Sequence, residues 1–406
     1  MPRDLLCESE TPSGHPMSDS KKRRIVLRDT VEKFSQDNFG LYEKQAKQNH
    51  QTWKLDKAEL PNQVRVIAGD WGDVTLALSK ATGNIYAVLN MANAYIPGGG
   101  YLEGLGAQEE NIYRRSNCHF YIYDEEMDED KSSYKQEMSD LINGVYGKVY
   151  LDVQNPRVCI KGREGPDVSG YIDLAPTDYF LFYELKSAAD NLSDARFFDE
   201  ASMRKKIAAQ LDTLKAKNIR HVVLSAFGCG AFGNPAKEVA KIYREELQKR
   251  AGDFDDVVFA VYDTEYGPNN FEPFKESLDG MPLGKEQLDK LKELLLNLKR
   301  NINLKEWDRI GLTFLYFNFR QTPPGIMQMR QVLQSDMSEV SKIKQIQKIA
   351  KENIDTFSFS SLIDNRAQIF YQNIMKITLG TIDDDLINLF KTSGEAQVVC
   401  QKSYNM

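Results

Sequence analysis

Short β-branched runs alternate with helix-forming segments over residues 25–280, and this alternation predicts an α/β sheet that is partly parallel. The predicted strands are VRVIAG at 64–69, NIYAVLNMA at 84–92, RVCIKG at 157–162, HVVLSAFG at 221–228 and VVFAVYD at 257–263. The predicted helices are 29–49, 199–217 and 235–251. The last of these follows Asn234-Pro235, a capping residue before a proline at the first helical position.

The composition changes near residue 280. Twenty-one of the 26 glycines lie in residues 1–280, whereas the remainder is rich in Leu, Ile, Lys and Gln. Apolar residues recur there at helical spacing, at Leu288, Leu291, Leu295 and Leu298 and again at Val340, Ile343, Ile346 and Ile349. We expect a flexible tail over 1–24, an α/β domain over 25–280 and an all-helical C-terminal module over 281–406, which Thr322-Pro323-Pro324-Gly325 interrupts.

Charge and cysteine usage narrow the classes of partner. Lys plus Arg (52) is fewer than Asp plus Glu (59), and the resulting net charge of −7 argues against direct DNA binding and capture by anionic membranes. No apolar run of membrane-spanning length and no secretory signal is present, so we expect a cytoplasmic protein. The five scattered cysteines form no CxxC pair and the four histidines form no zinc motif, which predicts chemistry without a metal or other cofactor.

The densest signal for chemistry is the segment 88–116, VLNMANAYIPGGGYLEGLGAQEENIYRRS. Gly98-Gly99-Gly100 lets the backbone turn sharply and approach a ligand, because no Cβ is in the way. After a further seven residues, Gln108-Glu109-Glu110 opens a predicted helix. Neighbouring helical residues diverge by about 100°, so one carboxylate can hold a substrate hydroxyl while the other transfers a proton. The alternative is a plain pair of charges at a helix start.

A second glycine cluster, Gly228-Cys229-Gly230-Ala231-Phe232-Gly233, lies between the predicted strand 221–228 and the helix 235–251. Such a loop presents backbone N–H groups and a helix N-terminus to phosphate. It also fits the GxGxxG pattern of dinucleotide-binding loops, but those follow the first strand of a βαβ unit. Cys229 is either a nucleophile or a small buried filler, and no base lies near it in the sequence.

Three further features have both a structural and a functional interpretation. Asp73 follows the first predicted strand, where it can cap the next helix or bind a ligand. Trp71 can stack on an adenine base or pack at the rim of a site. The acidic run 124–130 is interpreted as a solvated loop, with recognition of a partner as the alternative.

Together these segments resemble the bacterial-type poly(ADP-ribose) glycohydrolases, which are macrodomains. The resemblance rests on Gly98-Gly99-Gly100, the spacing to Gln108-Glu109-Glu110 and the later GCGAFGNP segment, and it covers about 64–263. It implies a macrodomain-like three-layer α/β/α mixed sheet. It says nothing of residues 281–406.

The resemblance implies a role for each matching residue. Glu110 would be the catalytic acid, and Glu109 and Asn93 would bind the distal ribose. Backbone amides of both glycine loops would hold the diphosphate, Phe232 would pack at the ribose end, and Asp73 would accept from the adenine amino group. The implied substrate-binding set is Asp73, Asn93, Gly98, Gly99, Gly100, Gln108, Gly228, Cys229, Gly230, Ala231 and Phe232.

The chemistry of the residues agrees with this resemblance. Cleavage at the anomeric carbon of ribose needs a protonated acid at the leaving oxygen and a water on the sugar. The expected function is hydrolysis of ribosyl glycosidic linkages of (poly)ADP-ribose. The alternatives are a hydrolase that removes a single ADP-ribose from a protein side chain, and a non-catalytic ADP-ribose reader. The helical module can bind a protein partner, such as the ADP-ribosylated substrate. Delivery of the protein into a host cell is a further alternative, although we read no secretion signal in the sequence.

Overall fold

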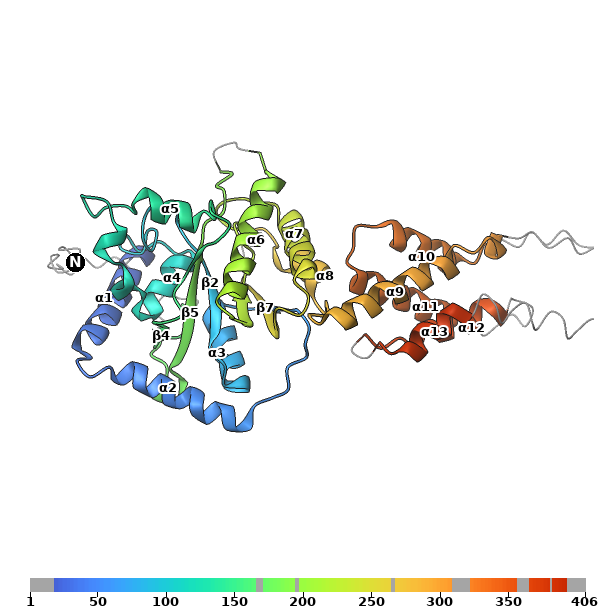
Figure 1. Cartoon of the computed structure of the whole chain (residues 1–406), viewed down its shortest axis with the longest axis horizontal. Helices are drawn as coiled ribbons and strands as arrows, with labels where there is room; N and C mark the ends of the chain where they lie inside the picture. Colours follow the sequence, from blue (N-terminus) through green and yellow to red (C-terminus); the bar gives the residue numbers. More distant parts are fainter. Residues whose placement is uncertain are drawn as a thin grey trace, which may run out of the picture. The chain divides into compact units, whose positions relative to one another are not determined.

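The computed structural model describes residues 18–165, 171–193, 197–263, 267–308, 322–355, 365–379 and 382–392. The chain divides into two compact units, Met1–Phe274 and Lys275–Met406 (Figure 1). The sequence placed the corresponding change in composition near residue 280. No helix in the described ranges is long and apolar enough to cross a membrane.

A seven-stranded sheet forms the centre of the first unit. Its strand order is β1-β7-β6-β2-β5-β3, and β4 also pairs with β5. Strands β1, β7, β6, β2 and β5 are parallel, whereas β3 and β4 are antiparallel to β5. This confirms the predicted mixed sheet. The strands are β1 (Arg65–Ala68), β2 (Tyr86–Met91), β3 (Tyr150–Leu151), β4 (Arg157–Cys159), β5 (Phe180–Ser187), β6 (His221–Leu224) and β7 (Asp256–Val261).

Helices cover both faces of this sheet (Figure 1). Because side chains alternate along a strand, Val258 and Ala260 of β7 face a core that includes Trp71, while Phe259 between them contacts the Tyr243 ring of α7 with centroids 5.0 Å apart. The predicted macrodomain-like α/β/α arrangement is confirmed. The helices are α1 (Asp19–Gln36), α2 (Leu41–Trp53), α3 (Trp71–Thr82), α4 (Gln108–Arg115), α5 (Gln136–Ile142), α6 (Glu200–Ala216), α7 (Ala236–Lys249) and α8 (Phe271–Leu278).

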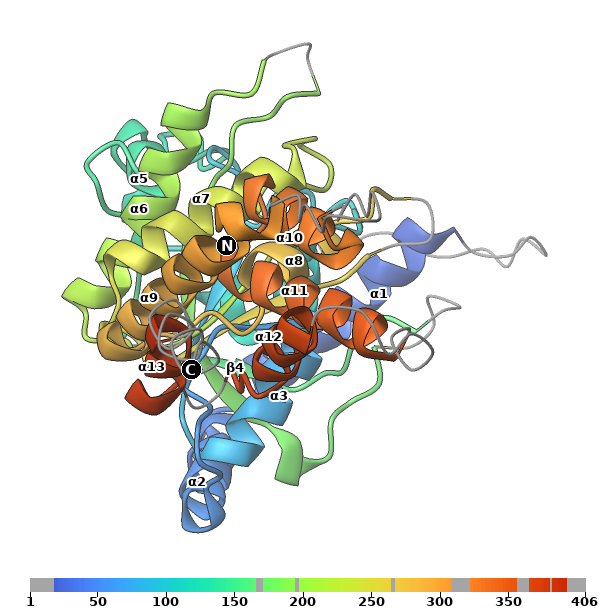
Figure 2. The same ribbon diagram turned by 90° about the vertical axis from the view of Figure 1, so that its right-hand side faces the viewer.

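The second unit is helical, as predicted, and Figure 2 looks onto its helices. They pack around an apolar core that includes Leu291, Leu294, Ile343 and Ile346. The Pro-Pro-Gly interruption marks the start of α10, because proline is favoured at the first helical position. The helices are α9 (Lys285–Ile302), α10 (Pro324–Gln334), α11 (Glu339–Asp355), α12 (Asn365–Met375) and α13 (Asp384–Thr392). Short 3₁₀ turns lie at Lys54–Asp56, Asn117–Tyr121, Asp124–Glu126, Pro176–Asp178 and Lys305–Asp308.

The N-terminal region differs from the prediction in two ways. The predicted helix 29–49 is two helices, because Gly40 has a left-handed backbone (φ 62°) that ends helical geometry between them. Residues 19–24, assigned to the flexible tail, are the first turns of α1, where Arg23 Nε donates to Glu164 Oε1 at 2.9 Å. The rest of that tail, residues 1–17, lies outside the described residues.

Strand β5 was not predicted, although it pairs with all of β2 through Phe182–Ser187. Its sequence FLFYELKS contains Glu184 and Lys186, and these charges disguise a strand in which both residues are buried. The cost of burying them is offset by the side chains that they contact. These contacts matter for the site described next.

Candidate active site

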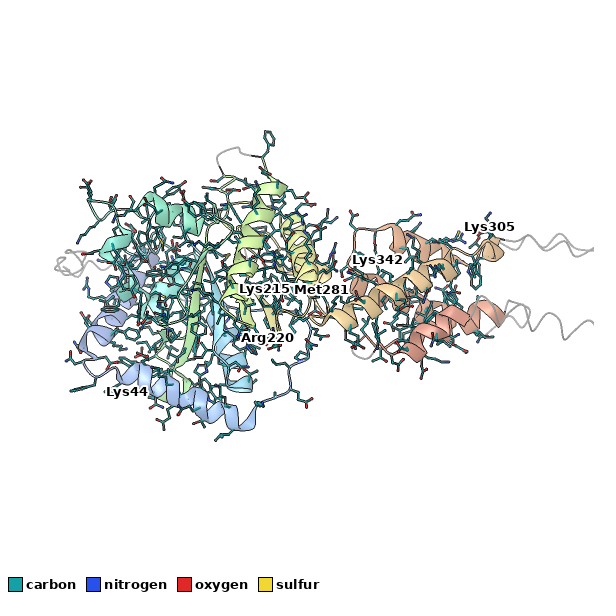
Figure 3. All side chains as sticks on the ribbon, in the orientation of Figure 1. Lys44, Lys215, Arg220, Met281, Lys305 and Lys342 are labelled. Carbon is teal, nitrogen blue, oxygen red and sulfur yellow. The ribbon has the colours of Figure 1, made fainter. Side chains whose placement is uncertain are left out.

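The loops that carry the predicted site residues follow parallel strands. The loop 92–107 follows β2, the loop 225–235 follows β6, and residues 69–73 follow β1. Strands β2 and β6 pair directly, and β7 lies between β6 and β1. Because the carboxyl ends of parallel strands meet at one edge of a sheet, all three loops lie along that edge. At the opposite edge lies Arg220, just before β6 (labelled in Figure 3), which pairs with Asp255 before β7 at 2.7 Å.

Glu109 and Glu110 are both buried in the first turn of α4, with exposed fractions of 4% and 6%. Glu109 Oε2 accepts from the Asn93 N–H at 2.7 Å, and Glu110 Oε1 accepts from the Gly100 N–H at 2.9 Å. The second oxygen of each group, Glu109 Oε1 and Glu110 Oε2, is buried without a hydrogen-bond partner among the described residues. A solvated pair of charges does not fit this geometry. Buried acceptors without partners are rare in folded proteins, so these two oxygens are sites for a ligand or water.

Burial raises the pKa of Glu109 well above its ordinary value. The Asn93 N–H opposes this shift because it stabilises the carboxylate, whereas the negative charge of Glu110 adds to it. The N-terminal end of α4 also favours negative charge, but burial dominates. Glu109 therefore keeps its proton to a higher pH than an exposed glutamate does.

The Gly98-Gly99-Gly100 segment wraps over the carboxyl pair. Gly99 has φ 58°, and a Cβ there would lie 2.7 Å from Glu110 Oε1, so the position requires glycine. Its N–H donates to the Ile96 carbonyl at 3.0 Å, while the Gly100 N–H donates to Glu110. The prediction that these amides hold a diphosphate does not hold for Gly99 and Gly100, because both donors are used within the protein. Gly98 N–H makes no hydrogen bond with a described residue.

Gln108 and Asn93 hold the backbone around the pair. Gln108 Oε1 accepts from the Met91 N–H at 3.0 Å and its Nε2 donates to the Leu89 carbonyl at 2.7 Å, which joins α4 to the end of β2. Gln108 therefore has a structural role through both polar atoms, and its substrate-binding role stays a prediction. Asn93 Oδ1 accepts from two backbone N–H groups of the following loop at 2.8 and 3.0 Å. Its Nδ2 bonds to no described residue and remains available.

In the second glycine loop, 228–233, most backbone N–H groups are free of partners in the described chain, in contrast to those of the 98–100 segment. The backbone N–H groups of four of its residues donate to no acceptor in the described part of the chain. These residues are Gly228, Gly230, Ala231 and Phe232. The loop leads into α7, so unsatisfied amides and a helix N-terminus lie in succession, which is the arrangement that binds phosphate. The loop thus keeps the free donors that the predicted binding of an anion requires.

Two side chains fix the shape of the second loop. Asn234 does not cap α7, whose N-cap position is Pro235; its Nδ2 donates to the carbonyls of Gly228 at 3.0 Å and Asp190 at 2.8 Å. Cys229 is buried, and burial raises the pKa of its thiol to about 12. A protonated buried thiol is a poor nucleophile, so Cys229 is the filler that the sequence left as one of two alternatives.

Asp70, and not Asp73, caps α3. Asp70 Oδ1 accepts from the N–H groups of Gly72 at 2.8 Å and Asp73 at 3.3 Å. Arg115 pairs with Asp70 and lies 3.4 Å from Asp73, whose other oxygen is 3.4 Å from Arg163 Nε. Burial raises the pKa of Asp73, although Arg115 opposes the shift. The side chain of Asp73 is therefore not used as a cap and is held at the edge where a ligand can reach it.

Trp71 is a packed aromatic residue. Only 3% of it is exposed, its Nε1 donates to Asn111 Oδ1 at 2.9 Å, and its ring lies 5.3 Å from that of Phe182. The guanidinium group of Arg115 lies over the same ring at 4.8 Å. Because the ring is buried and its N–H is occupied, the structure favours the packed interpretation of Trp71 over stacking on adenine.

The acidic run 124–130 is not a plain solvated loop. Its Met127 is buried in a small apolar cluster with Ala92 and Tyr134 and forms a β-bridge with Tyr134. The Tyr134 N–H donates to the Tyr95 carbonyl at 2.7 Å. This segment therefore contacts the loop that follows β2 through Met127 and Tyr134.

Sequence reasoning missed a second group of buried residues, Glu184, Lys186 and Tyr134. The signal that could have found them is the pair of charges within an otherwise apolar strand, because such charges are rarely buried without a reason. Among the described residues, no three His, Cys, Asp or Glu side chains are grouped to hold a metal ion.

The N-terminal third of the chain is similar to a known protein family. Residues 13–147 match the family model of the microbial-type PARG catalytic domain, where PARG denotes poly(ADP-ribose) glycohydrolase. This match confirms the resemblance found in the sequence. A search of the curated proteins found no match.

Solved structures of two bacterial enzymes are also similar. Poly(ADP-ribose) glycohydrolase from Thermomonospora curvata bound to the inhibitor ADP-HPD is 22% identical, with 62% of this chain and 97% of that chain covered and a TM-score of 0.42. The enzyme from Deinococcus radiodurans in complex with ADP-ribose is 22% identical, with 57% and 90% covered and a TM-score of 0.39.

Proposed function

We propose that this chain, whose residues 13–147 match the microbial-type PARG catalytic domain, hydrolyses ribosyl glycosidic linkages of ADP-ribose polymers. The observation that carries the proposal is the buried pair Glu109 and Glu110. Each carboxyl group is held through one oxygen by a backbone N–H, and each presents its other oxygen without a partner. One pair of fixed, adjacent acids thus offers two free oxygens to a substrate.

The reaction assigns a different task to each acid. Glu110 donates a proton through Oε2 to the leaving oxygen as the bond from this oxygen to the anomeric carbon breaks. Water then bonds to the anomeric carbon, and its proton returns to Glu110, so the acid is regenerated. Glu109 fixes the sugar: in its ionised form its Oε1 accepts a hydrogen bond from a ribose hydroxyl. Asn93, whose Nδ2 is available, assists at the same ribose.

The two glycine loops have different roles in this proposal. The free amides of 228–232 bind the diphosphate, and Phe232 packs at the ribose end. The 98–100 loop orients Glu110 through the Gly100 N–H. Asp73 accepts from the adenine amino group at the edge where Arg115 and Arg163 hold it. Neutral donors thus recognise the anion, which suits a chain whose net charge is −7.

A comparison of two glutamine substitutions tests this function. Glu110→Gln removes the transferable proton and is expected to lower ADP-ribose release from poly(ADP-ribosyl)ated protein by at least about 100-fold, the usual scale of acid catalysis. Glu103→Gln, an exposed position in the same loop, is the control and keeps the wild-type rate. Binding of ADP-ribose, measured by calorimetry, is retained in both variants.

The outcomes separate the three functions. Release by Glu110→Gln at the wild-type rate would contradict the assigned mechanism. Release by the wild type from mono(ADP-ribosyl)ated protein, with no action on polymer, points to the hydrolase of single ADP-ribosyl groups. Binding without release from any substrate points to a reader.

A further inference from the structure

The 100–107 loop, which joins the first glycine segment to α4, is anchored by a buried arginine. Arg114 Nη1 donates to the Leu105 carbonyl at 2.7 Å, and the Leu105 N–H donates to the Gly100 carbonyl at 3.0 Å. The next hydrogen bond runs from the Gly100 N–H to Glu110 Oε1. A continuous chain of hydrogen bonds thus joins Arg114 to the acid to which we assign the proton transfer.

The burial of Arg114 is costly for the fold. Its side chain is 0% exposed, it forms no ion pair with a described residue, and its Nη2 is buried without a hydrogen-bond partner among these residues. A buried charge without a carboxylate at contact distance costs folding free energy. The stability of the domain alone therefore does not account for this arginine, whereas an anchor for the loop does.

The Tyr171 hydroxyl fixes Arg114. It accepts from Arg114 Nε at 3.0 Å and from Asn111 Nδ2 at 3.2 Å, and it donates to Glu164 Oε2 at 2.8 Å. Asn111 and Arg114 lie about one turn apart on α4, whereas Glu164 and Tyr171 lie between β4 and β5. The hydroxyl, with its donor and acceptor capacity in use, therefore joins the helix that carries the acids to a separate segment of the chain.

The first turns of α1 supply a second anchor for the same loop. Arg23 Nε donates to Glu164 Oε1 at 2.9 Å, and its Nη1 donates to the Gly104 carbonyl at 3.5 Å. Gly104 has φ 81°, and a Cβ there would overlap the Ser20 carbonyl oxygen, so the loop packs directly on α1. Both carboxylate oxygens of Glu164 are thus used, one by Tyr171 and one by Arg23.

We propose that Tyr171 is a positioning residue for the proposed acid. Its hydroxyl fixes both arginines, Arg114 directly and Arg23 through Glu164, and these hold the loop where the Gly100 N–H meets the acid. The inference rests on the function proposed above, in which that acid transfers a proton. The proposed diphosphate donors belong to the second glycine loop, so loss of the anchor lowers turnover without weakening the binding of ADP-ribose.

Tyr171→Phe removes the hydroxyl and keeps the ring. We expect kcat on poly(ADP-ribose) to fall by about tenfold or more, because small displacements of a catalytic group cost this much. The Kd for ADP-ribose in calorimetry should stay near that of the wild type. Tyr86→Phe is the control, since Tyr86 is also fully buried, its hydroxyl donates to Asp256 Oδ2 at 2.6 Å, and it lies at the start of β2. This control should keep the wild-type kcat.

Hydrogen exchange of the loop backbone in the full chain measures the anchor without turnover. The N–H groups of Gly100 and Leu105 are hydrogen bonded in the wild type. Tyr171→Phe should raise their exchange rates by about tenfold or more, because the loop then opens more easily, and Tyr86→Phe should leave them unchanged. Faster exchange in Tyr171→Phe, with no activity of the wild type on any substrate, supports the anchor and rejects the proposed function.

Wild-type kcat and wild-type exchange in Tyr171→Phe would overturn the inference. A fall in kcat without faster exchange would also overturn it, as would an equal fall in Tyr86→Phe. Thermal unfolding shows whether each variant is folded. If Tyr171→Phe does not fold, Arg23→Met tests the second anchor at a partly exposed position. It should speed the exchange of the loop and lower kcat by about threefold or more, and unchanged exchange in this variant would contradict the inference.

Discussion

The two glycine loops of this protein look alike in sequence and use their backbones in opposite ways. In 98–100, two of the three amides are occupied, one by the Ile96 carbonyl and one by Glu110. In 228–233, four amides of the described structure are unoccupied. The first loop therefore orients an acid, whereas the second offers donors to an anion. Glycine enrichment indicates that a backbone approaches something closely; it does not say whether the neighbour is protein or ligand.

The largest effect is expected for Gly99→Ala. The added Cβ would lie 2.7 Å from Glu110 Oε1 at a backbone with φ 58°, so the carboxyl group or the loop must move. We expect activity to fall by about 100-fold or more, since displaced catalytic groups cost that much, with a smaller loss of ADP-ribose binding. The control is Gly147→Ala, which carries similar backbone strain (φ 68°) with nothing within 4 Å. Wild-type turnover by Gly99→Ala would show that this loop does not orient Glu110.

Gly230→Asp tests the other side of the comparison. Nothing lies within 4 Å of a Cβ at Gly230, so the side chain fits, but it adds a negative charge to the loop whose amides we propose to bind the diphosphate. We expect the affinity for ADP-ribose, measured by calorimetry, to fall by about tenfold or more, because a carboxylate repels phosphate. The melting temperature should stay near that of the wild type. Gly230→Ala is the matched control and should bind normally. Unchanged affinity of Gly230→Asp would remove the diphosphate from this loop.

Asn234→Ala should have a moderate effect on stability. It removes a buried hydrogen bond to the Gly228 carbonyl and a partly buried one to the Asp190 carbonyl, and is expected to lower the free energy of unfolding by about 1–3 kcal/mol. Asn49→Ala removes two similar bonds, to the carbonyls of Pro176 and Tyr179, far from the loop in sequence. Both should lose stability in urea unfolding, but only Asn234→Ala should also weaken ADP-ribose binding. Equal binding in both variants would separate Asn234 from the site.

The smallest expected effect is on the free energy of unfolding, through the buried carboxyl group of Glu109. Because burial raises the pKa of Glu109, the folded state holds a proton that the unfolded chain releases above its ordinary pKa, near 4.5. The stability contributed by this group is full below that pH and is lost as the pH rises toward the higher folded value. Glu109→Gln should therefore stabilise the fold by about 1 kcal/mol at pH 8 and much less at pH 4.5. Urea unfolding at both pH values measures this, with Glu103→Gln as the control.

Much of the architecture was predictable because strands and helices leave local patterns. The alternation in 25–280 and the leucine spacing in the C-terminal unit each reflect burial of one face of an element. The break at Gly40 was missed because a left-handed glycine is invisible to apolar periodicity, and it divides one predicted helix into two. Strand β5 was missed because the partners of its two charges are distant in sequence: Glu184 pairs with Arg157, and Lys186 donates to the Tyr134 hydroxyl.

For the candidate site, too, the sequence predicts local features but not contacts between residues that are distant in the chain. The sequence located Glu109, Glu110 and both glycine loops, since their spacing is a local property. It could not tell which amides are free, because the partner of the Gly100 N–H is an acid ten residues away. It left Asp73 open between a helix cap and a ligand contact, and the structure gives the cap to Asp70, which is three residues earlier.

The most direct test of this account is a crystal structure of the Glu110→Gln variant with ADP-ribose. The account predicts that the diphosphate accepts from the amides of 228–232, that a ribose hydroxyl lies within hydrogen-bond distance of Glu109 Oε1, and that the Gly100 N–H stays on the side chain at position 110. A diphosphate bound by the amides of Gly99 and Gly100, with the 228–232 loop empty, would contradict it.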